Sequence, residues 1–324
     1  MFNRRQLVQS LALTAVAGTL PVARAQAFPS KPIRIVCPYP PGATTDTISR
    51  LMANALQTTS GVTVVVENKG GAGGNIGTEA VARSEADGYT LLLGALGPLS
   101  ANEALYPKLP FNPGRDFTPL ALAAVVPLIM VAHPSFPANT VAEAVKLLRA
   151  SPGKFSYASA GNGTPQHLAA EMFKQLTRSA VVHIPYRGSG PALNDVMGGQ
   201  VPLLFEASPA VLPLIKAGRV KALAVTTRER IASLPQVPTL KESGVDADIG
   251  GWYGFLAPAG TPPDRVAWLT EHMRKALAEP ATQAKLAELG SQKVDSSPQA
   301  FARLIESERK RWDTLIRERG IKLD

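Results

Sequence analysis

The chain has 324 residues, 45% of them hydrophobic, and a formal net charge of +9 at pH 7. Cys37 is the only cysteine, which excludes an intrachain disulfide, and its apolar surroundings favour a buried side chain over a reactive thiol. Lysine and arginine are dispersed among acidic residues with few aromatics beside them, which argues against a nucleic-acid-binding surface. The excess positive charge instead favours a small anionic ligand.

The N-terminus has the pattern of an export signal. Arg4 and Arg5 precede an apolar run over residues 11–20, and the small residues of Ala23-Arg24-Ala25 predict cleavage after Ala25. The paired arginines suit both the general secretory route and the twin-arginine route. The apolar run is far shorter than the about 20 residues that span a bilayer, so a membrane anchor is not expected. Removal of a leader with three arginines and no acid lowers the formal net charge from +9 to +6.

After the leader, strand-like and helical patterns alternate, as in a parallel sheet covered by helices. We expect a strand over residues 33–38, a helix that ends at Ser60, a strand over 62–67, a helix that ends at Arg83 and a strand over 90–93. A proline-rich surface passage over 107–119 then leads to an apolar run over 120–132. Pro127 divides this run into two predicted strands that meet at a bend.

A second domain is expected next, because about 300 residues exceed the usual size of one hydrophobic core. Helices are predicted over residues 141–150, 165–177, 191–197 and 210–217, and strands over 155–158, 181–184, 201–206 and 220–226. The last strand would return the chain to the first domain, so that two crossings form a hinge. We therefore predict a signal over 1–25, a discontinuous first lobe over 26–125 and 227–324, and a second lobe over 126–226.

The C-terminal part is predicted to contain a strand over residues 252–257 and helices over 264–277, 281–289 and 298–319. The last helix carries apolar residues at three- and four-residue spacing, namely Phe301, Leu304, Ile305, Trp312, Leu315 and Ile316. Such a stripe usually docks on a core, and a groove for a partner helix is the alternative.

Four strand-like runs end in glycine-containing turns where a helical pattern begins, at residues 40–46, 69–75, 159–164 and 186–190. The first four amides of a helix lack intrahelical acceptors, and the helix N-terminus carries about half a positive charge. We therefore expect each turn to present unpaired N–H groups, and several turns around one cleft to bind a carboxylate. One such turn alone would be explained better by a tight connection in any α/β protein, whereas four together favour an anion site.

Motifs for catalysis and for metal or nucleotide binding are incomplete. Gly153-Lys154 has Leu148 where a Walker loop needs its first glycine, and Ile76 stands where a dinucleotide fingerprint needs Gly or Ala. No serine lies in a Gly-x-Ser-x-Gly elbow. No paired metal spacing links the four histidines, which are His133, His167, His183 and His272. We therefore expect no cofactor and no metal.

A series of specific motifs runs from Phe28 to the C-terminus. They lie at residues 29–33, 40–42 with Asp46, 65–77, 87–91, 105–107, 159–164 with His167-Leu168, 185–188, 198–201 and 256–262. Through them the chain resembles the periplasmic solute receptors of the Bug, or TctC-like, family, which serve tripartite tricarboxylate transporters. The resemblance implies a two-lobed α/β fold of the periplasmic-binding-protein type II, with two parallel or mixed sheets flanked by helices. It implies a cleft that closes on a small organic carboxylate, no enzymatic chemistry, membrane transporter subunits as partners, and a monomer.

The resemblance also implies a set of ligand-binding residues. From the first lobe these are Tyr39, Gly42, Ala43, Thr44 and Asp46, with Ala95 and Leu96 as an apolar wall. From the second lobe they are Ser159, Asn162, Gly163, Thr164 and His167 as donors, then Tyr186, Gly188 and Ser189 on the opposite wall, and Glu206 at a strand end. Asp46 is expected to cap the helix rather than contact the ligand, because its charge would repel a carboxylate. Arg187 is left open as a surface charge.

Three departures from the family pattern bear on specificity. Ala43 stands where a second glycine is usual, which narrows the space above the first turn. Glu206 stands where Asp is common and would contact a ligand amine or pair with Lys or Arg. Residues 95–98 lack the usual hydroxyls, which favours an aromatic or alkyl mono- or dicarboxylate over citrate unless Leu96 is a core residue.

Two other functions remain open at this level. A loaded receptor of this fold can engage a signalling protein instead of a permease. A secreted hydrolase or isomerase would use the same cleft, with His167 or Glu206 as general base.

Overall fold

The computed structural model describes residues 28–292 and 294–322, so the predicted export signal and its cleavage site lie outside the described residues. The chain divides into an N-terminal unit that ends at Ser30 and a compact unit that begins at Lys31. All described helices and strands belong to the second unit. None of these helices combines the length and the apolar character needed to cross a membrane.

The first lobe is built on three parallel strands, β1 (Ile33–Cys37), β2 (Val64–Asn68) and β3 (Thr90–Ala95). Strand β1 lies in the middle and pairs with both others. The connections carry helices α2 (Thr44–Ser60) and α3 (Asn75–Ala82), with a short turn of helix η1 (Ala72–Gly74) before α3. Helix α2 ends where Gly61 takes the left-handed conformation that terminates helices, with a φ of 72°.

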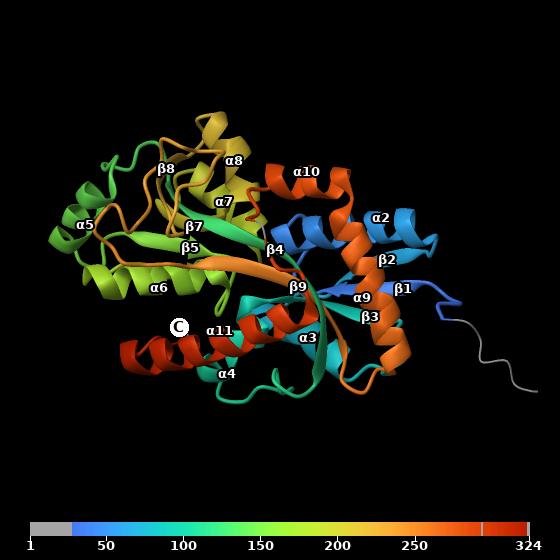
Figure 1. Cartoon of the computed structure of the whole chain (residues 1–324). Coiled ribbons are helices and arrows are strands. Elements are labelled where there is room, and N and C mark those ends of the chain that lie inside the picture. The colour runs from blue at the N-terminus through green and yellow to red at the C-terminus, as the bar shows by residue number, and fades with distance from the viewer. Residues whose placement is uncertain (1–27, 293, 323–324) are drawn as a thin grey trace, which may run out of the picture. The chain divides into compact units, whose positions relative to one another are not determined.

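Two long antiparallel strands, β4 (Phe117–Ala132) and β9 (Gly250–Pro258), run side by side through the middle of the molecule (Figure 1). Strand β9 also pairs with β3, which ties both strands to the first lobe. Pro127 is the last residue of β4 that pairs with β9, and Leu128 is the first that pairs with β7. The prediction of two strands meeting at a bend is therefore wrong. The proline does not break the strand, because it lies where the pairing changes partners and its missing N–H is not needed.

The second lobe is built on β5 (Ser156–Ser159), β6 (Val182–Pro185), β7 (Leu203–Ala207) and β8 (Lys221–Val225). Strand β5 is parallel to β6 and to β7, whereas β7 and β8 are both antiparallel to the end of β4. The helices of this lobe are α5 (Val141–Ala150), α6 (Pro165–Thr177), α7 (Ser189–Met197) and α8 (Ser208–Lys216). The complete strand order is β2-β1-β3-β9-β4-β7-β5-β6, with β8 also on β4. The fold class is thus α/β with mixed sheets, as expected.

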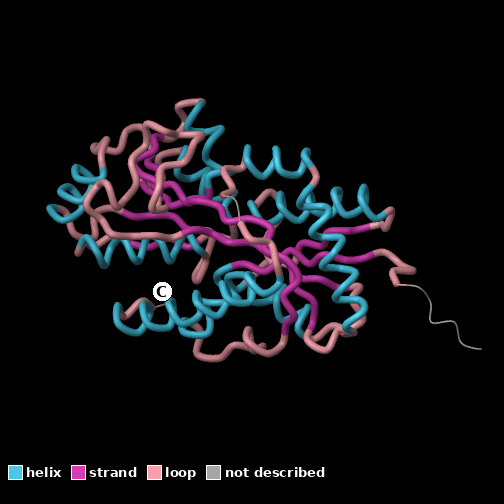
Figure 2. The backbone as a smooth tube through the Cα atoms, viewed as in Figure 1, coloured by secondary structure: helices cyan, strands magenta, loops and turns pink. Residues whose placement is uncertain are grey.

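Helices lie outside the strands in both lobes (Figure 2). The remaining ones are η2 (Gly97–Ala101), α4 (Asn102–Leu105), α9 (Pro263–Ala278), α10 (Pro280–Glu288) and α11 (Pro298–Arg319). The apolar stripe of α11 docks on the core, since Phe301, Ile305, Trp312 and Ile316 are buried. The helical segment over residues 97–105 was not predicted. The exact lobe boundaries near residues 125 and 226 stay a prediction.

Candidate ligand cleft

A cleft of about 730 Å³, called the outer cleft below, lies where the two lobes face each other. All four glycine-containing turns contribute to it. Its lining consists of Tyr39, Pro40, Pro41, Asn68, residues 70–74, Tyr106, residues 160–162 and residues 185–188. The turns that the sequence places far apart are therefore brought together around one space.

A second, much smaller space of about 30 Å³, called the inner hollow, lies beside the outer cleft. It shares Tyr39, Ala160 and Gly188 with the outer cleft, so the two spaces are neighbours. Its other lining residues are Ala43, Thr44, Thr45, Ala95, Pro165, Gln166, Ser189 and Tyr253.

Three helices begin at the inner hollow. Thr44 and Thr45 open α2, Gln166 lies in the first turn of α6, and Ser189 opens α7. Neither α2 nor α7 has a side chain that caps its first amides. Because first-turn amides lack intrahelical acceptors and helix N-termini are partly positive, this hollow favours an anionic oxygen.

Four glycine amides in these turns are not the free donors that the sequence predicted. The amides of Gly42, Gly161 and Gly163 donate to Asp46 Oδ2, Ser159 Oγ and His167 Nδ1, at 3.0, 3.1 and 3.2 Å. The amide of Gly188 donates to the carbonyl oxygen of Ala160 at 3.2 Å. The expectation of unpaired N–H groups at these positions is wrong, because neighbouring side chains and carbonyls fix the tight turns. The first-turn amides of the helices remain as donors for a ligand.

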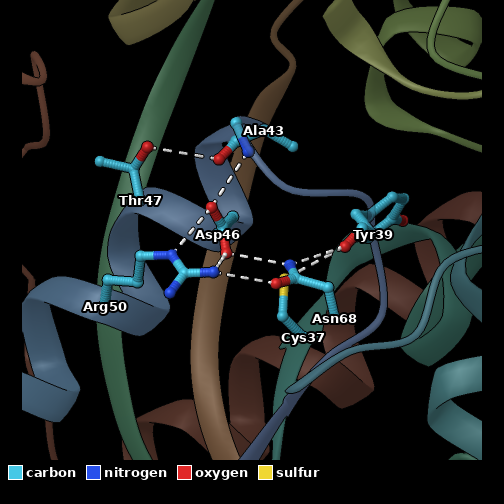
Figure 3. Close-up of polar contacts among 8 residues, drawn as sticks. Cys37, Tyr39, Ala43, Asp46, Thr47, Arg50 and Asn68 are labelled. Atoms are coloured by element: carbon cyan, nitrogen blue, oxygen red, sulfur yellow. Dashed lines mark hydrogen bonds and ion pairs between the residues drawn. The ribbon is translucent and has the colours of Figure 1, made fainter. Parts of the chain in front are cut away.

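The carboxylate of Asp46 holds the first turn in place through hydrogen bonds (Figure 3). Besides the amide of Gly42, its carboxylate accepts hydrogen bonds from Arg50 Nε at 3.1 Å and from Asn68 Nδ2 at 2.9 Å. Asn68 in turn donates to the carbonyl oxygen of Tyr39 at 3.0 Å. Burial works to raise the pKa of Asp46, but the hydrogen bonds from Arg50, Gly42 and Asn68 outweigh it and lower that pKa. Asp46 lines neither space and positions the backbone that does.

Replacing Asp46 with Asn should lower the free energy of unfolding by about 1–2 kcal/mol at pH 7, since it removes charge-assisted hydrogen bonds of a nearly buried carboxylate. The folded-state pKa of Asp46 lies below its unfolded value, so its contribution is complete above about pH 4 and is lost as the pH falls through the folded-state pKa. Urea unfolding of both proteins at pH 7 and pH 3 measures this. A stability difference that grows on acidification would contradict the assignment.

The turn over residues 159–164 is held by a buried aromatic and hydroxyl network. Ser159 Oγ lies 2.6 Å from His183 Nε2, and the rings of His183 and His167 stack with centroids 4.5 Å apart. Because the Gly163 amide can only donate, His167 Nδ1 accepts and its proton lies on Nε2. Thr164 Oγ donates to the carbonyl oxygen of Gly161 at 2.6 Å. Ser159, Thr164 and His167 are buried and line neither space, so they position the turn.

Glu206 lies beneath the inner hollow at the end of β7, completely buried. Its Oε1 accepts hydrogen bonds from Gln166 Nε2 at 2.7 Å and from the Ala207 amide at 2.8 Å. Burial raises the pKa of Glu206. The hydrogen bonds with the Ala207 amide, Gln166 and Ser189 lower that pKa, but they offset the effect of burial only in part. Burial and the neighbouring Glu206 also raise the pKa of Tyr253. Glu206 does not line the hollow, but its carboxyl is hydrogen-bonded to Gln166, which does.

The predicted site residues divide into two groups. Those that line the outer cleft or the inner hollow are Tyr39, Ala43, Thr44, Ala95, Asn162, Tyr186, Gly188 and Ser189. Those that line neither are Gly42, Asp46, Leu96, Ser159, Gly163, Thr164, His167 and Glu206. Leu96 is fully buried. The hydroxyl of Tyr186 donates a hydrogen bond to Asp195. Burial and this hydrogen bond raise the pKa of Tyr186 to about 12.

Several lining residues were missed. Gln166 follows the predicted start of its helix at Pro165, so a check of first-turn side chains would have found it. Tyr253 and Tyr106 come from remote segments, and no local motif marks them. Within the described residues no cluster of His, Cys, Asp and Glu is placed to hold a metal ion.

The lobes contact each other closely around the cleft. Tyr106 Oη donates to the carbonyl oxygen of Asn162 at 3.3 Å. Gly97 lies so near the second lobe that a Cβ there would be 2.6 Å from the carbonyl oxygen of Gly163, and a Cβ at Gly188 would be 3.2 Å from the ring of Pro40. The structure is thus a closed arrangement in which glycines permit the approach.

The comparison with protein families agrees with this geometry. The family model of the tripartite tricarboxylate transporter family receptor, TctC, matches residues 48–321. The chain belongs to the TctC family. Protein BugT of Bordetella pertussis is 37% identical over 311 residues, which cover 95% of this chain and 95% of that protein. A protein from the tcbD-tcbE intergenic region of Pseudomonas sp. strain P51 is 37% identical over 98% of this chain and 94% of its own length.

Solved structures of TctC-like receptors have the same two-lobed fold. R. palustris Rpa4515 with adipate superimposes with a TM-score of 0.88 at 34% identity, covering 92% of this chain and 100% of that one. The periplasmic binding protein BugD gives a TM-score of 0.87 at 36% identity with the same coverage. MatC from Rhodopseudomonas palustris with bound malate gives 0.85 at 32% identity, covering 89% of this chain and 100% of that one.

Proposed function

We propose that this protein is a non-enzymatic periplasmic receptor that binds a small organic carboxylate between its lobes and delivers it to membrane subunits of a tripartite tricarboxylate-type transporter. The observation that carries the proposal is the convergence of three helix N-termini, those of α2, α6 and α7, on the inner hollow. One of them comes from the first lobe and two from the second. A carboxylate held there would accept donors from both lobes and so favour closure.

The relatives support the same ligand class. Rpa4515 is described with adipate and MatC with malate, both small carboxylates. BugD is described as periplasmic, which fits the export pattern over residues 1–25. We extend these properties to this chain, together with a monomeric state. A signalling role for the loaded receptor is the alternative that shares the same site, and neighbouring genes for one large and one small multi-span membrane protein would favour transport.

General-base chemistry has weak support in the cleft. His167 is fully buried and uses Nδ1 to accept from Gly163, while Glu206 is fully buried beneath Gln166. A general base must come within hydrogen-bond reach of the proton that it abstracts, and neither side chain lines the outer cleft or the inner hollow. We therefore favour binding over catalysis. Purified protein that converts an acid which it binds would reverse this choice.

A proline at position 189 tests the main-chain donor directly. Proline fits the first position of a helix and lacks an N–H, so Ser189→Pro removes one donor without breaking α7. We expect it to weaken carboxylate binding about tenfold, the effect of one charge-assisted hydrogen bond. The matched control is Ser189→Ala, which loses the hydroxyl and keeps the amide.

Isothermal titration with a panel of mono-, di- and tricarboxylates at pH 7 gives the affinities, and native mass spectrometry of the freshly purified protein identifies a co-purified acid. Equal affinities of the proline and alanine variants would remove the amide of Ser189 from the site. Failure of every acid to bind the unmodified protein would refute the proposed function.

A further inference from the structure

Charge is distributed unevenly around the outer cleft. Among the described residues that line it, Arg187 has the only charged side chain, and no Asp or Glu lines it. The inner hollow has no charged side chain in its lining, and its positive character comes from helix starts. An anion in the cleft would therefore meet one guanidinium and no opposing carboxylate.

Arg187 is exposed and forms no hydrogen bond or ion pair with another described side chain. Many other arginines are engaged, for example Arg34 with Glu67 at 2.7 Å and Arg309 with Glu103 at 2.6 Å. A guanidinium without a carboxylate partner keeps its donors for a ligand, and its planar fork suits a carboxylate in bidentate geometry.

The backbone around Arg187 is held firmly although its side chain is not. The amide of Tyr186 donates to the carbonyl oxygen of Ser159 at 3.0 Å, and that of Gly188 to Ala160 at 3.2 Å. Gly188 also lies against the ring of Pro40 in the opposite lobe. The turn therefore places Arg187 at the lobe boundary, two residues before Ser189, which is the first residue of α7 and lines the inner hollow.

Two anion-binding features thus lie in neighbouring spaces. We propose that Arg187 binds the second carboxylate of a dicarboxylate whose first carboxylate is held by the helix starts at the inner hollow. The inference rests on the proposed function and adds the residue that distinguishes dicarboxylates from monocarboxylates. Arg187 was left open in the sequence as a surface charge, since no local pattern shows what a turn arginine faces.

The test compares acids of equal chain length that differ only in the second carboxylate. Isothermal titration at constant ionic strength uses butyrate and succinate, hexanoate and adipate, and octanoate and suberate, because the span of the site is not fixed. We expect at least one diacid to bind the unmodified protein about tenfold tighter than its monoacid, as one charge-assisted contact provides. Arg187→Gln should remove this advantage and leave the affinity for the monoacid within about threefold.

The matched control is Arg219→Gln. Arg219 is also exposed and forms no side-chain hydrogen bond with the described residues. It lies between α8 and β8, outside both spaces. It changes the net charge equally, so a general electrostatic effect would appear in both variants. Only the Arg187 variant should lose the preference for diacids.

The outcomes separate the two proposals. If no acid binds the unmodified protein, the proposed function fails and the inference with it. If acids bind but diacids have no advantage, or if Arg187→Gln weakens mono- and diacids equally, the inference is wrong and the proposed function stands. Monoacid binding by the variant serves as its own check of folding.

Discussion

Alanine at Gly97 is expected to weaken ligand binding about 10- to 100-fold while the separate lobes remain folded. Gly97 begins the helical segment η2, and its φ is not in the left-handed region, so alanine introduces no backbone strain there. Its added Cβ would, however, lie 2.6 Å from the carbonyl oxygen of Gly163 in the opposite lobe. Overpacking of this kind costs about 1–3 kcal/mol, which corresponds to the stated loss of affinity.

The cost falls on the closed state alone, because the clash disappears when the lobes separate. Since a ligand held by both lobes binds the closed state, its apparent affinity falls with the population of that state. Titration calorimetry with the tightest acid of the panel measures the affinity, and small-angle scattering measures the compaction that the acid induces.

A matched control for Gly97→Ala is Gly198→Ala. Gly198 ends α7 with a φ of −81°, and its nearest obstacle to a Cβ, the carbonyl oxygen of Asn194, is 3.3 Å away. This variant should bind and compact as the unmodified protein does. Unchanged affinity of the Gly97 variant, or a loss of stability in the absence of ligand, would show that Gly97 does not act through closure.

Helix positions follow from the sequence where a cap and an apolar stripe agree. Helices α5, α6 and α11 have the predicted bounds, and each has an N-cap side chain that accepts from its first turn: Thr140, Thr164 and Ser297. These signals are local, since a cap and the amide that it binds lie within three residues of each other. The order of strands and helices, and hence the fold class, could be read for the same reason.

The continuity of β4 could not be predicted from its own residues. A proline in an apolar run normally ends or bends a strand, and the sequence gives no sign that the run changes partners at that point. The partners are β9 before Pro127 and β7 after it, and both lie more than 70 residues away in the chain. Pairing between remote segments depends on the whole fold.

The candidate site was predicted in outline and not in its donors. Convergence of the four turns followed from the topology of alternating strands and helices. The acceptor of each amide could not be predicted in this way. In the sequence the amides of Gly42 and Gly163 look equally free to bind a ligand, whereas in the structure they donate to Asp46 and His167. Arg187 illustrates the reverse case, in which a long polar side chain lines the outer cleft although no local pattern reveals it.

Removal of the Phe301 ring should destabilise the protein by about 3–5 kcal/mol, as is usual for a buried phenylalanine replaced by alanine. Phe301 is completely buried in the first turn of α11, and its ring meets that of Trp252 edge to face with centroids 5.6 Å apart. Leu304→Ala on the same helix is the control and should cost about 1 kcal/mol, because Leu304 is only partly buried. Urea unfolding monitored by far-ultraviolet circular dichroism measures both.

The Phe301 ring packs against Gly254 of β9, so a second substitution can test whether the loss of stability comes from this contact. Gly254 lies under Phe301 so closely that a Cβ at position 254 would overlap the ring, and it would also lie 2.8 Å from the carbonyl oxygen of Ala121. Gly254→Ala alone should therefore destabilise the fold, yet in the Phe301→Ala background the new methyl group enters the vacated volume. The double variant should lose at least about 1 kcal/mol less than the two single losses combined. Additive losses would mean that α11 is held to the sheet elsewhere, with Trp312 as the next residue to replace.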